Sequence, residues 1–185
     1  MVEDIYVETD ERMEKVIASF QRELATLRAG RATPSLLDRI EVNYYDTPTP
    51  LIQLAGITAP EPRLLVIQPW DKSSMGNIEK AILKSDLGLT PINDGNVIRL
   101  QIPQLTEERR RDLVKHVRKK AEESRVGIRN IRREANDSLK QMEKSGDISE
   151  DSWRRAQDEV QDLTDAKIVR IDELLQLKEK EILEV

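Results

Sequence analysis

The chain contains no cysteine and a single histidine. The lack of cysteine excludes disulfides, zinc–thiolate sites and thiol catalysis, and it is compatible with a reducing compartment. Aromatic residues make up only 3% of the chain, which leaves little material for a surface on which bases could stack. The histidine, His116, lies in a charged helical segment, where a solvated side chain is a better interpretation than a catalyst.

Long apolar runs are also missing. The longest spans residues 64–67, which is too short to cross a membrane. The N-terminal segment is acidic and lacks the apolar core of a signal or transit peptide. We therefore expect a cytoplasmic protein that does not bind membranes and is a monomer.

Motifs that carry chemistry are absent as well. The seven glycines are not clustered, and neither a phosphate-binding loop motif nor a dinucleotide-binding motif occurs. Acidic neighbours such as Asp158 and Glu159 diverge on a helix and cannot share a metal ion. The sequence therefore predicts no catalytic residue, no metal site and no cofactor, and we do not expect an enzyme.

Charge is unevenly distributed along the chain. The net charge of −5 by itself argues against a nucleic-acid-binding protein. Residues 106–143, however, hold 12 Lys/Arg against 8 Asp/Glu. Residues 149–185 hold 6 against 11, and residues 1–30 hold 4 against 7. One basic segment beside two acidic ones indicates a single binding face on an otherwise anionic body.

Three segments have the periodicity of amphipathic helices. Apolar residues recur at spacings of three and four over residues 10–29, over 106–143, and again after Ser149. Gly30 is expected to end the first helix, and Thr106 and Ser149 are the predicted N-caps of the others. The second helix would be about 57 Å long at 1.5 Å per residue. Such long apolar stripes can bury one another in a three-helix bundle.

The middle of the chain has a different texture, and all eight prolines lie between residues 34 and 103. Alternating Ile40, Val42 and Tyr44 are typical of a strand. We expect two helical pieces: a turn over 34–37 capped by Thr33 and a short helix around 78–82 capped by Ser73 or Ser74. Strands are expected near 40–44, 64–67, 89–92 and 97–102, with a further extended piece at 51–54. Turns are expected at 46–48 and 93–96.

These segments predict an α+β protein with two domains. Residues 1–30 and 105–185 would form an elongated, discontinuous three-helix bundle, and residues 31–104 would form a small inserted β/α/β domain. The two chain crossings predict a hinge formed by Gly30, Arg31, Pro103 and Gln104, and an L-like outline.

An arginine stripe runs along the basic helix. On a helical wheel Arg118, Arg125, Arg129 and Arg132 fall within about 60°, with Arg133 just beside them. The planar guanidinium suits bidentate contact with phosphate, so the stripe predicts recognition of RNA backbone and shape. Two alternatives remain open: the arginines pair with acidic residues on the neighbouring helices, or they are simply solvated. Glu122 lies on the same face and could pair with Arg118 or Arg125 at helical spacing.

Several strings resemble bacterial ribosome recycling factors. They occur in the family's order and cover nearly the whole chain: residues 30–38, 44–45, 47–51, 78–82, 85–89, 105–110, 128–137 (IRNIRREAND), 148–151 and 163–165. Each is short, but their joint occurrence is highly specific. Two positions depart from the family's pattern, namely Asp46 in place of a turn glycine and Gly127 in place of a small helix former.

The resemblance implies a three-helix bundle joined to a β/α/β domain by two hinge segments, with an outline similar to transfer RNA. It also implies a non-enzymatic role: binding the post-termination ribosome and, with elongation factor G and GTP, splitting the subunits. By matching position, the arginines implied to contact large-subunit ribosomal RNA are Arg28, Arg31, Arg110, Arg129, Arg132 and Arg133, to which the stripe adds Arg125. The alternatives are a structural or chaperone-like helical adaptor with protein partners and, less favoured, a nuclease or phosphohydrolase.

Overall fold

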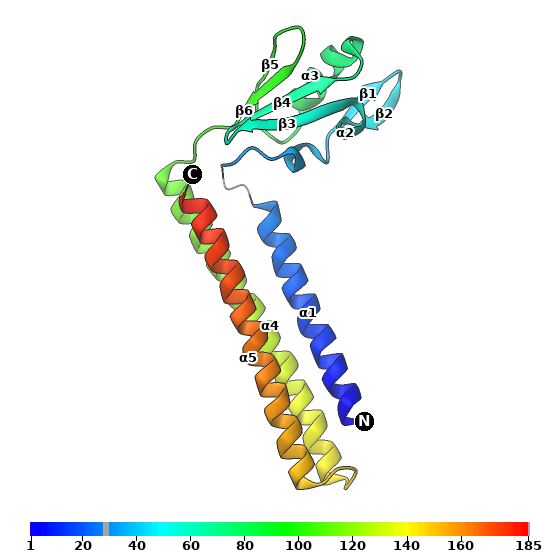
Figure 1. The fold of residues 1–185 in the computed structure, drawn as a ribbon, viewed down its shortest axis with the longest axis vertical. Helices are drawn as coiled ribbons and strands as arrows, with labels where there is room; N and C mark the ends of the chain where they lie inside the picture. The colour runs from blue at the N-terminus through cyan, green and yellow to red at the C-terminus, as the bar shows by residue number, and fades with distance from the viewer. Residues whose placement is uncertain (28–29, 185) are drawn as a thin grey trace. The chain divides into compact units, whose positions relative to one another are not determined.

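The structure, a computed structural model, describes residues 1–27 and 30–184. Within them the chain forms two compact units, one built from the three long helices α1, α4 and α5 and the other from the residues between α1 and α4 (Figure 1). The strands of the described residues all belong to the second unit. The fold is thus α+β with an inserted sheet domain, as the sequence predicts.

The bundle helices are α1 (Val2–Thr26), α4 (Glu107–Lys144) and α5 (Glu150–Leu183). The bounds of α4 and the start of α5 confirm the prediction, and the Ser149 side chain caps α5 by accepting a hydrogen bond from the Ser152 amide at 3.1 Å. The chain reverses between α4 and α5 at Gly146, which has a φ of +79°.

The prediction for the first helix was wrong at both ends. The helix α1 begins at Val2 and not at residue 10, and it ends at Thr26, where Leu27 is already extended, before the predicted end at Gly30. Val2 and Ile5 pack against a cluster formed by α4 and α5. Thr9 is buried, and its hydroxyl donates a hydrogen bond to the Ile5 carbonyl at 2.6 Å. These apolar contacts are sparse and separated by charged residues, so the periodicity fades there although the helix continues.

One apolar face of each helix forms the bundle core. In α1 the buried side chains are spaced three and four apart, as expected for a helix packed on one side. The core residues buried to 1% exposure or less are Met13, Ile17, Phe20, Val117, Ala121, Ile128, Leu139, Val160, Ile171 and Ile182. Burial of this stripe stabilises helices that would be marginal on their own.

Ion pairs flank this core on the seams that α1 makes with its neighbours. Arg12 pairs with Glu134 of α4 at 2.6 Å. On the other side Lys167 of α5 pairs with Asp10 at 2.6 Å and also with Glu14. The exposed Arg12–Glu134 pair contributes little stability by itself. Lys167 is mostly buried between its two half-exposed carboxylate partners.

Acidification is expected to weaken the α1–α5 seam through Glu14. The Lys167 ammonium, which donates a hydrogen bond to Glu14, holds the pKa of that carboxyl below its usual value near 4.5. A lowered folded-state pKa contributes stability above the unfolded value, and this contribution is lost as pH falls through the folded pKa. Glu14→Gln should therefore cost about 0.2–1 kcal/mol at pH 7, and its difference from the parent should shrink below pH 4.5. Denaturant unfolding at several pH values measures this. Glu11→Gln, an exposed position on the same helix, is the control, and an equal cost at every pH would contradict the assignment.

The inserted unit contains two antiparallel sheets. Its elements in chain order are η1 (Pro34–Leu37), β1 (Glu41–Tyr44), β2 (Thr47–Pro50), α2 (Leu51–Leu54), β3 (Ala55–Glu61), β4 (Leu64–Pro69), η2 (Lys72–Ser74), α3 (Met75–Lys84), β5 (Pro91–Asn93) and β6 (Ile98–Gln101). Strands β1 and β2 form a hairpin, and the other four pair in the order β3-β4-β6-β5. A separate core, including Leu37, Val42, Leu65, Ile67 and Ile78, holds the unit together.

Three local predictions for this unit need correction. Residues 51–54 form the short helix α2 and not an extended piece, because Leu51 and Leu54, three apart, are both buried. The turn before β2 consists of Tyr45 and Asp46, both with positive φ, so residues 47 and 48 already belong to the strand. Strand β3, which contains a proline and lies at a sheet edge where proline is tolerated, had not been predicted in full.

Capping of the α3 region also differs in detail from the prediction. Ser74 stands at the N-cap of α3, but its side chain makes no capping bond. The cap is supplied earlier by Asp71, whose carboxylate accepts the Ser73 amide at 2.9 Å. Asp46, the departure noted in the turn, has a φ of +61° and therefore supports the turn that glycine would otherwise make.

Replacing the mid-helix glycine of α4 should stabilise the protein. A Cβ at Gly127 would lie 3.7 Å from Val16 of α1, which is ordinary van der Waals contact. Alanine restores helix propensity at no steric cost, so Gly127→Ala is expected to add about 1 kcal/mol to the free energy of unfolding. Denaturant titration measures this gain. Gly146→Ala is the matched control and should instead lose about 1 kcal/mol, because its φ of +79° is unfavourable for alanine. A loss at position 127 would show that the α1–α4 contact has no room.

Candidate nucleic-acid interface

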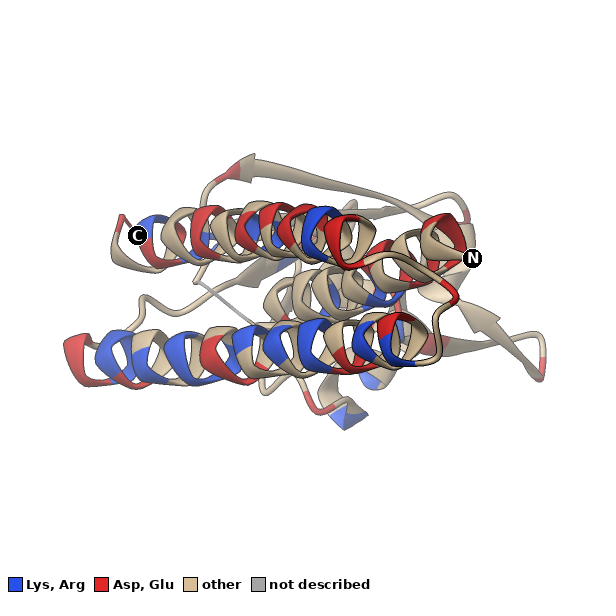
Figure 2. Ribbon diagram, turned by 90° about the horizontal axis from the view of Figure 1, so that it is seen from below, with Lys and Arg blue, Asp and Glu red and all other residues tan. Residues whose placement is uncertain are grey.

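The basic helix predicted from the sequence is α4, and its neighbour α5 is acidic. Figure 2 shows more blue than red along α4 and more red than blue along α5. Three arginines of the stripe lie on the side of α4 that turns toward α5, because Arg118 and Arg125 reach α5 carboxylates and Arg132 reaches the Gln161 amide of α5. The internal pairing left open by the sequence therefore occurs for part of the stripe.

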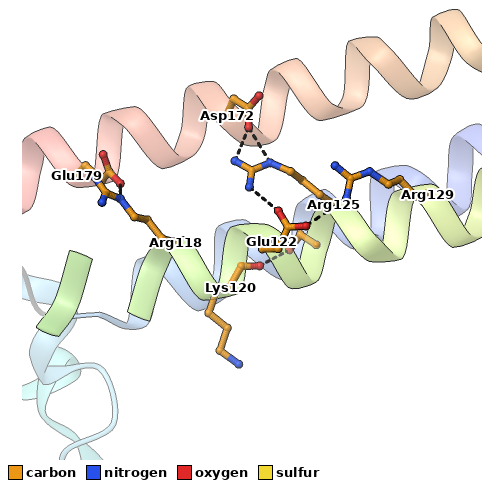
Figure 3. A network of polar contacts seen from close by, with 8 residues as sticks. Arg118, Lys120, Glu122, Arg125, Arg129, Asp172 and Glu179 are labelled. Carbon is orange, nitrogen blue, oxygen red and sulfur yellow. Dashed lines mark hydrogen bonds and ion pairs between the residues drawn. The ribbon is translucent and has the colours of Figure 1, made fainter. Parts of the chain in front are cut away.

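Two arginines of α4 form ion pairs with carboxylates of α5, and each such α4–α5 pair is called a rung below (Figure 3). Arg118 Nε donates to Glu179 Oε1 at 2.5 Å. Arg125 places both Nε and Nη2 on Asp172 Oδ1, at 2.9 and 2.5 Å, and only 19% of its side chain is exposed. Burial opposes the charge of Arg125, but its hydrogen bonds to Asp172 and Glu122 raise its pKa. All three of its guanidinium nitrogens donate to carboxylates, so a phosphate would have to compete with these acceptors.

Glu122 links Arg125 to the next arginine of the stripe. It accepts Arg125 Nη1 at 3.0 Å and Arg129 Nη1 at 3.2 Å. These two hydrogen bonds hold the pKa of the Glu122 carboxyl below its usual range. Arg129 is thus half-exposed and tethered through a single nitrogen, and its remaining N–H groups have no protein partner among the described residues.

Arg132 and Arg133 differ from the arginines before them. Arg132 Nη1 donates to the neutral amide oxygen of Gln161 at 3.3 Å, and Arg133 Nη1 donates to Asn130 at 3.4 Å. Neither makes an ion pair within residues 1–27 and 30–184. The uncompensated positive charge of the stripe is therefore concentrated after Arg129.

The remaining predicted arginines lie apart from this stretch. Arg110 is in the first turn of α4, and its Nε is buried without a hydrogen-bond partner in the described structure. Arg31 is exposed and belongs to the inserted unit. Arg28, also predicted to contact RNA, lies outside the described residues.

The predicted hinge residues flank two anchored points of the inserted unit. Gly30 has a φ of +76°, and Pro103 and Gln104 lie in a segment without helix or strand. Next to them, the Ala32 amide donates to the Pro62 carbonyl and the Ile102 amide donates to the Arg63 carbonyl, both at 2.7 Å. Both linking segments are therefore tied to the same β3–β4 turn, and Gly30, Arg31, Pro103 and Gln104 lie just outside the tied residues.

The sequence left open pairing with acidic residues of the neighbouring helices, but it did not identify Asp172 and Glu179 as the partners. Arg118 and Arg125 are seven residues apart, as are Asp172 and Glu179. In an antiparallel helix pair, a repeat of seven on both helices brings such residues opposite each other in turn. This repeat was the available signal, but it is visible only once the antiparallel register is known.

Two other kinds of site are missing from the same part of the chain. No group of three or more His, Cys, Asp or Glu in the described residues could hold a metal ion. None of the described helices is both long enough and apolar enough to cross a bilayer.

The fold and the charge pattern define a class of protein: two-unit α+β proteins whose helical bundle presents a basic face.

The family follows from comparison with known proteins. The family model "Ribosome recycling factor" matches residues 20–183. The chain is 62% identical to the ribosome-recycling factor of Carboxydothermus hydrogenoformans and 59% identical to that of Bacillus subtilis (strain 168), in each case over 185 residues and the full length of both chains. The chain belongs to the ribosome recycling factor family.

Solved structures agree with this assignment. The solution structure of a ribosome recycling factor matches with a TM-score of 0.77 and 44% identity, covering all of this chain and 98% of that one. A second match is the T. thermophilus ribosome recycling factor, which is bound together with E. coli elongation factor G to the E. coli post-termination complex. There the TM-score is 0.64, the identity is 50%, and 99% of each chain is covered.

Proposed function

We propose that this protein recycles ribosomes: it binds the post-termination ribosome and, with elongation factor G and GTP, splits the subunits and frees them from mRNA. The observation that carries this proposal is identity of about 60% to ribosome-recycling factors over the entire chain. The relative bound with elongation factor G to a post-termination complex supports the same partners. On this proposal the protein acts in the cytoplasm and contributes binding energy without making or breaking bonds.

The proposed RNA contact is the basic face of α4. Arg132 and Arg133 carry charge that no carboxylate among the described residues compensates, and Arg129 has N–H groups to spare. Large-subunit ribosomal RNA would be held through its phosphates, so binding should be shape-selective and salt-sensitive. Arg110, Arg31 and Arg28 join this set through the family resemblance. Arg125 is the weakest member, because an RNA contact would require it to leave Asp172.

The two linking segments are proposed as a hinge for movement during splitting. The backbone bonds at Ala32 and Ile102 fix the inserted unit's side of each crossing. Rotation would therefore concentrate at Gly30–Arg31 and Pro103–Gln104, which lie next to the anchored residues.

A subunit-dissociation assay tests the proposed function. Post-termination ribosomes are incubated with the protein, elongation factor G and GTP, and subunits are quantified by sedimentation. Splitting should require all three components, and ribosome binding by the protein alone should weaken steeply between low and high salt. Binding that does not respond to salt, without splitting, would favour the adaptor alternative instead.

A further inference from the structure

The arginine–carboxylate ladder between α4 and α5 changes at its third rung. Arg118, Arg125 and Arg132 are seven residues apart on α4, and Asp165, Asp172 and Glu179 are seven apart on α5. The first two rungs are ion pairs, Arg118 with Glu179 and Arg125 with Asp172. By the same register Arg132 and Asp165 are expected opposite each other, yet they form no ion pair in the described structure.

Gln161 occupies the third rung. Its amide nitrogen donates to Asp165 Oδ1 at 2.9 Å, and its amide oxygen accepts Arg132 Nη1 at 3.3 Å. Gln161 and Asp165 are one helical turn apart, so the side chain lies along α5 and satisfies the carboxylate from its own helix. The neutral Gln161 side chain thus hydrogen-bonds both Arg132 and Asp165, which do not pair with each other in the described structure.

We propose that Gln161 is a positioning residue that keeps Arg132 uncommitted, so that its guanidinium is available to a phosphate of ribosomal RNA. This inference rests on the proposed function, since it gives Gln161 of α5 a supporting role for the proposed RNA-binding face of α4. Gln161 orients Arg132 and does not itself need to touch RNA.

The chemistry of the acceptor explains the advantage of an amide at this place. A carboxylate accepting from arginine makes a charge-assisted hydrogen bond roughly twice as strong as a neutral one, and it compensates the charge that attracts phosphate. The amide oxygen of Gln161 holds the guanidinium by one neutral acceptor and leaves its charge in place. Arg125 shows the other outcome, with all three nitrogens on carboxylates.

Gln161→Glu is the first test, because it places a carboxylate where Arg132 now meets an amide. Its affinity for ribosomes, measured by sedimentation at several salt concentrations, should fall about tenfold, and its salt slope should decrease by about one, as for loss of one phosphate contact. Gln176→Glu is the matched control, with the same charge change at an exposed position of α5. It should stay within about twofold of the parent. Equal affinity of the two variants would overturn the inference.

Rescue separates positioning from a merely structural role. Gln161→Ala removes the spacer and lets Arg132 pair with Asp165, so affinity should fall. Adding Asp165→Asn removes that competing carboxylate and should restore affinity to within about twofold of the parent. Thermal unfolding of these variants identifies any loss that comes from folding alone. A loss that Asp165→Asn leaves uncorrected in well-folded protein would contradict the inference.

A measurement on the free protein distinguishes this inference from the function on which it rests. The Arg132 Nε–H resonance should shift in Gln161→Ala and return when Asp165→Asn is added, with no ribosome present. Absence of that shift overturns the positioning role even if the protein recycles ribosomes. Failure of the parent protein to bind ribosomes would refute the proposed function, while the resonance would still report the contact between Gln161 and Arg132.

Discussion

Arg132→Ala is expected to weaken ribosome binding by about 10- to 100-fold and to reduce subunit splitting in proportion. Hydrogen bonds to charged groups contribute roughly 1.5–3 kcal/mol each, which converts to this range. Arg132 lacks a compensating carboxylate in the described structure, so its whole charge is available to phosphate, and it gives up only one neutral bond, to Gln161. The salt slope of binding should fall by about one. Sedimentation with ribosomes and the splitting assay measure both quantities.

Two further variants define the scope of this result. Arg154→Ala removes the same charge from α5, where Arg154 is 67% exposed and pairs with Glu150 one turn away. It should bind ribosomes as the parent does. Arg129→Ala should lose less affinity for ribosomes than Arg132→Ala, because Arg129 is already paired with the Glu122 carboxylate. If Arg132→Ala split ribosomes as well as the parent, the role given to this residue would be wrong.

Phe20→Ala is expected to produce the largest loss of stability, about 3–5 kcal/mol, in the bundle. Phe20 is the chain's only phenylalanine and is 1% exposed on the buried face of α1. Truncation leaves a cavity in a helix of 25 residues that depends on this stripe for docking. Hydrogen exchange should show earlier opening in α1, α4 and α5, while β3 to β6 keep their protection, because the inserted unit has its own core.

Leu83→Ala is the control for this experiment. Leu83 lies in α3 and is 61% exposed, so its truncation should change the free energy of unfolding by less than about 0.5 kcal/mol. If Phe20→Ala lowered protection equally in both units, the two cores would not be independent and the division into units would need revision.

The sequence by itself determined the framework of the molecule. A period of three and four residues in the apolar pattern predicts α4 and the start of α5 to within a residue or two, because each helix buries one face along its whole length. Local chemistry predicts the cap at Ser149 and the turn around Gly146, which depend only on neighbouring atoms. The strings shared with ribosome recycling factors identified the family, which the full-length matches confirm.

Other features of the fold required tertiary contacts. The start of α1 at Val2 depends on Val2 and Ile5 packing against side chains of α4 and α5. The helical conformation of 51–54 depends on burial of Leu51 and Leu54 in the core of the inserted unit. Neither contact is visible in the local pattern, because the partners are distant in sequence.

The candidate site divides in the same way. The helical wheel groups Arg118, Arg125 and Arg132 on one face, and all three contact α5, since that grouping follows from helix geometry alone. Only the antiparallel register of α4 and α5 decides their chemical state. It brings carboxylates from 61 and 47 residues away to Arg118 and Arg125, and an amide to Arg132. The physical reason is that the charge available to a phosphate depends on the nearest acceptor across the seam. The identity of the residue as arginine determines only that it is able to bind phosphate.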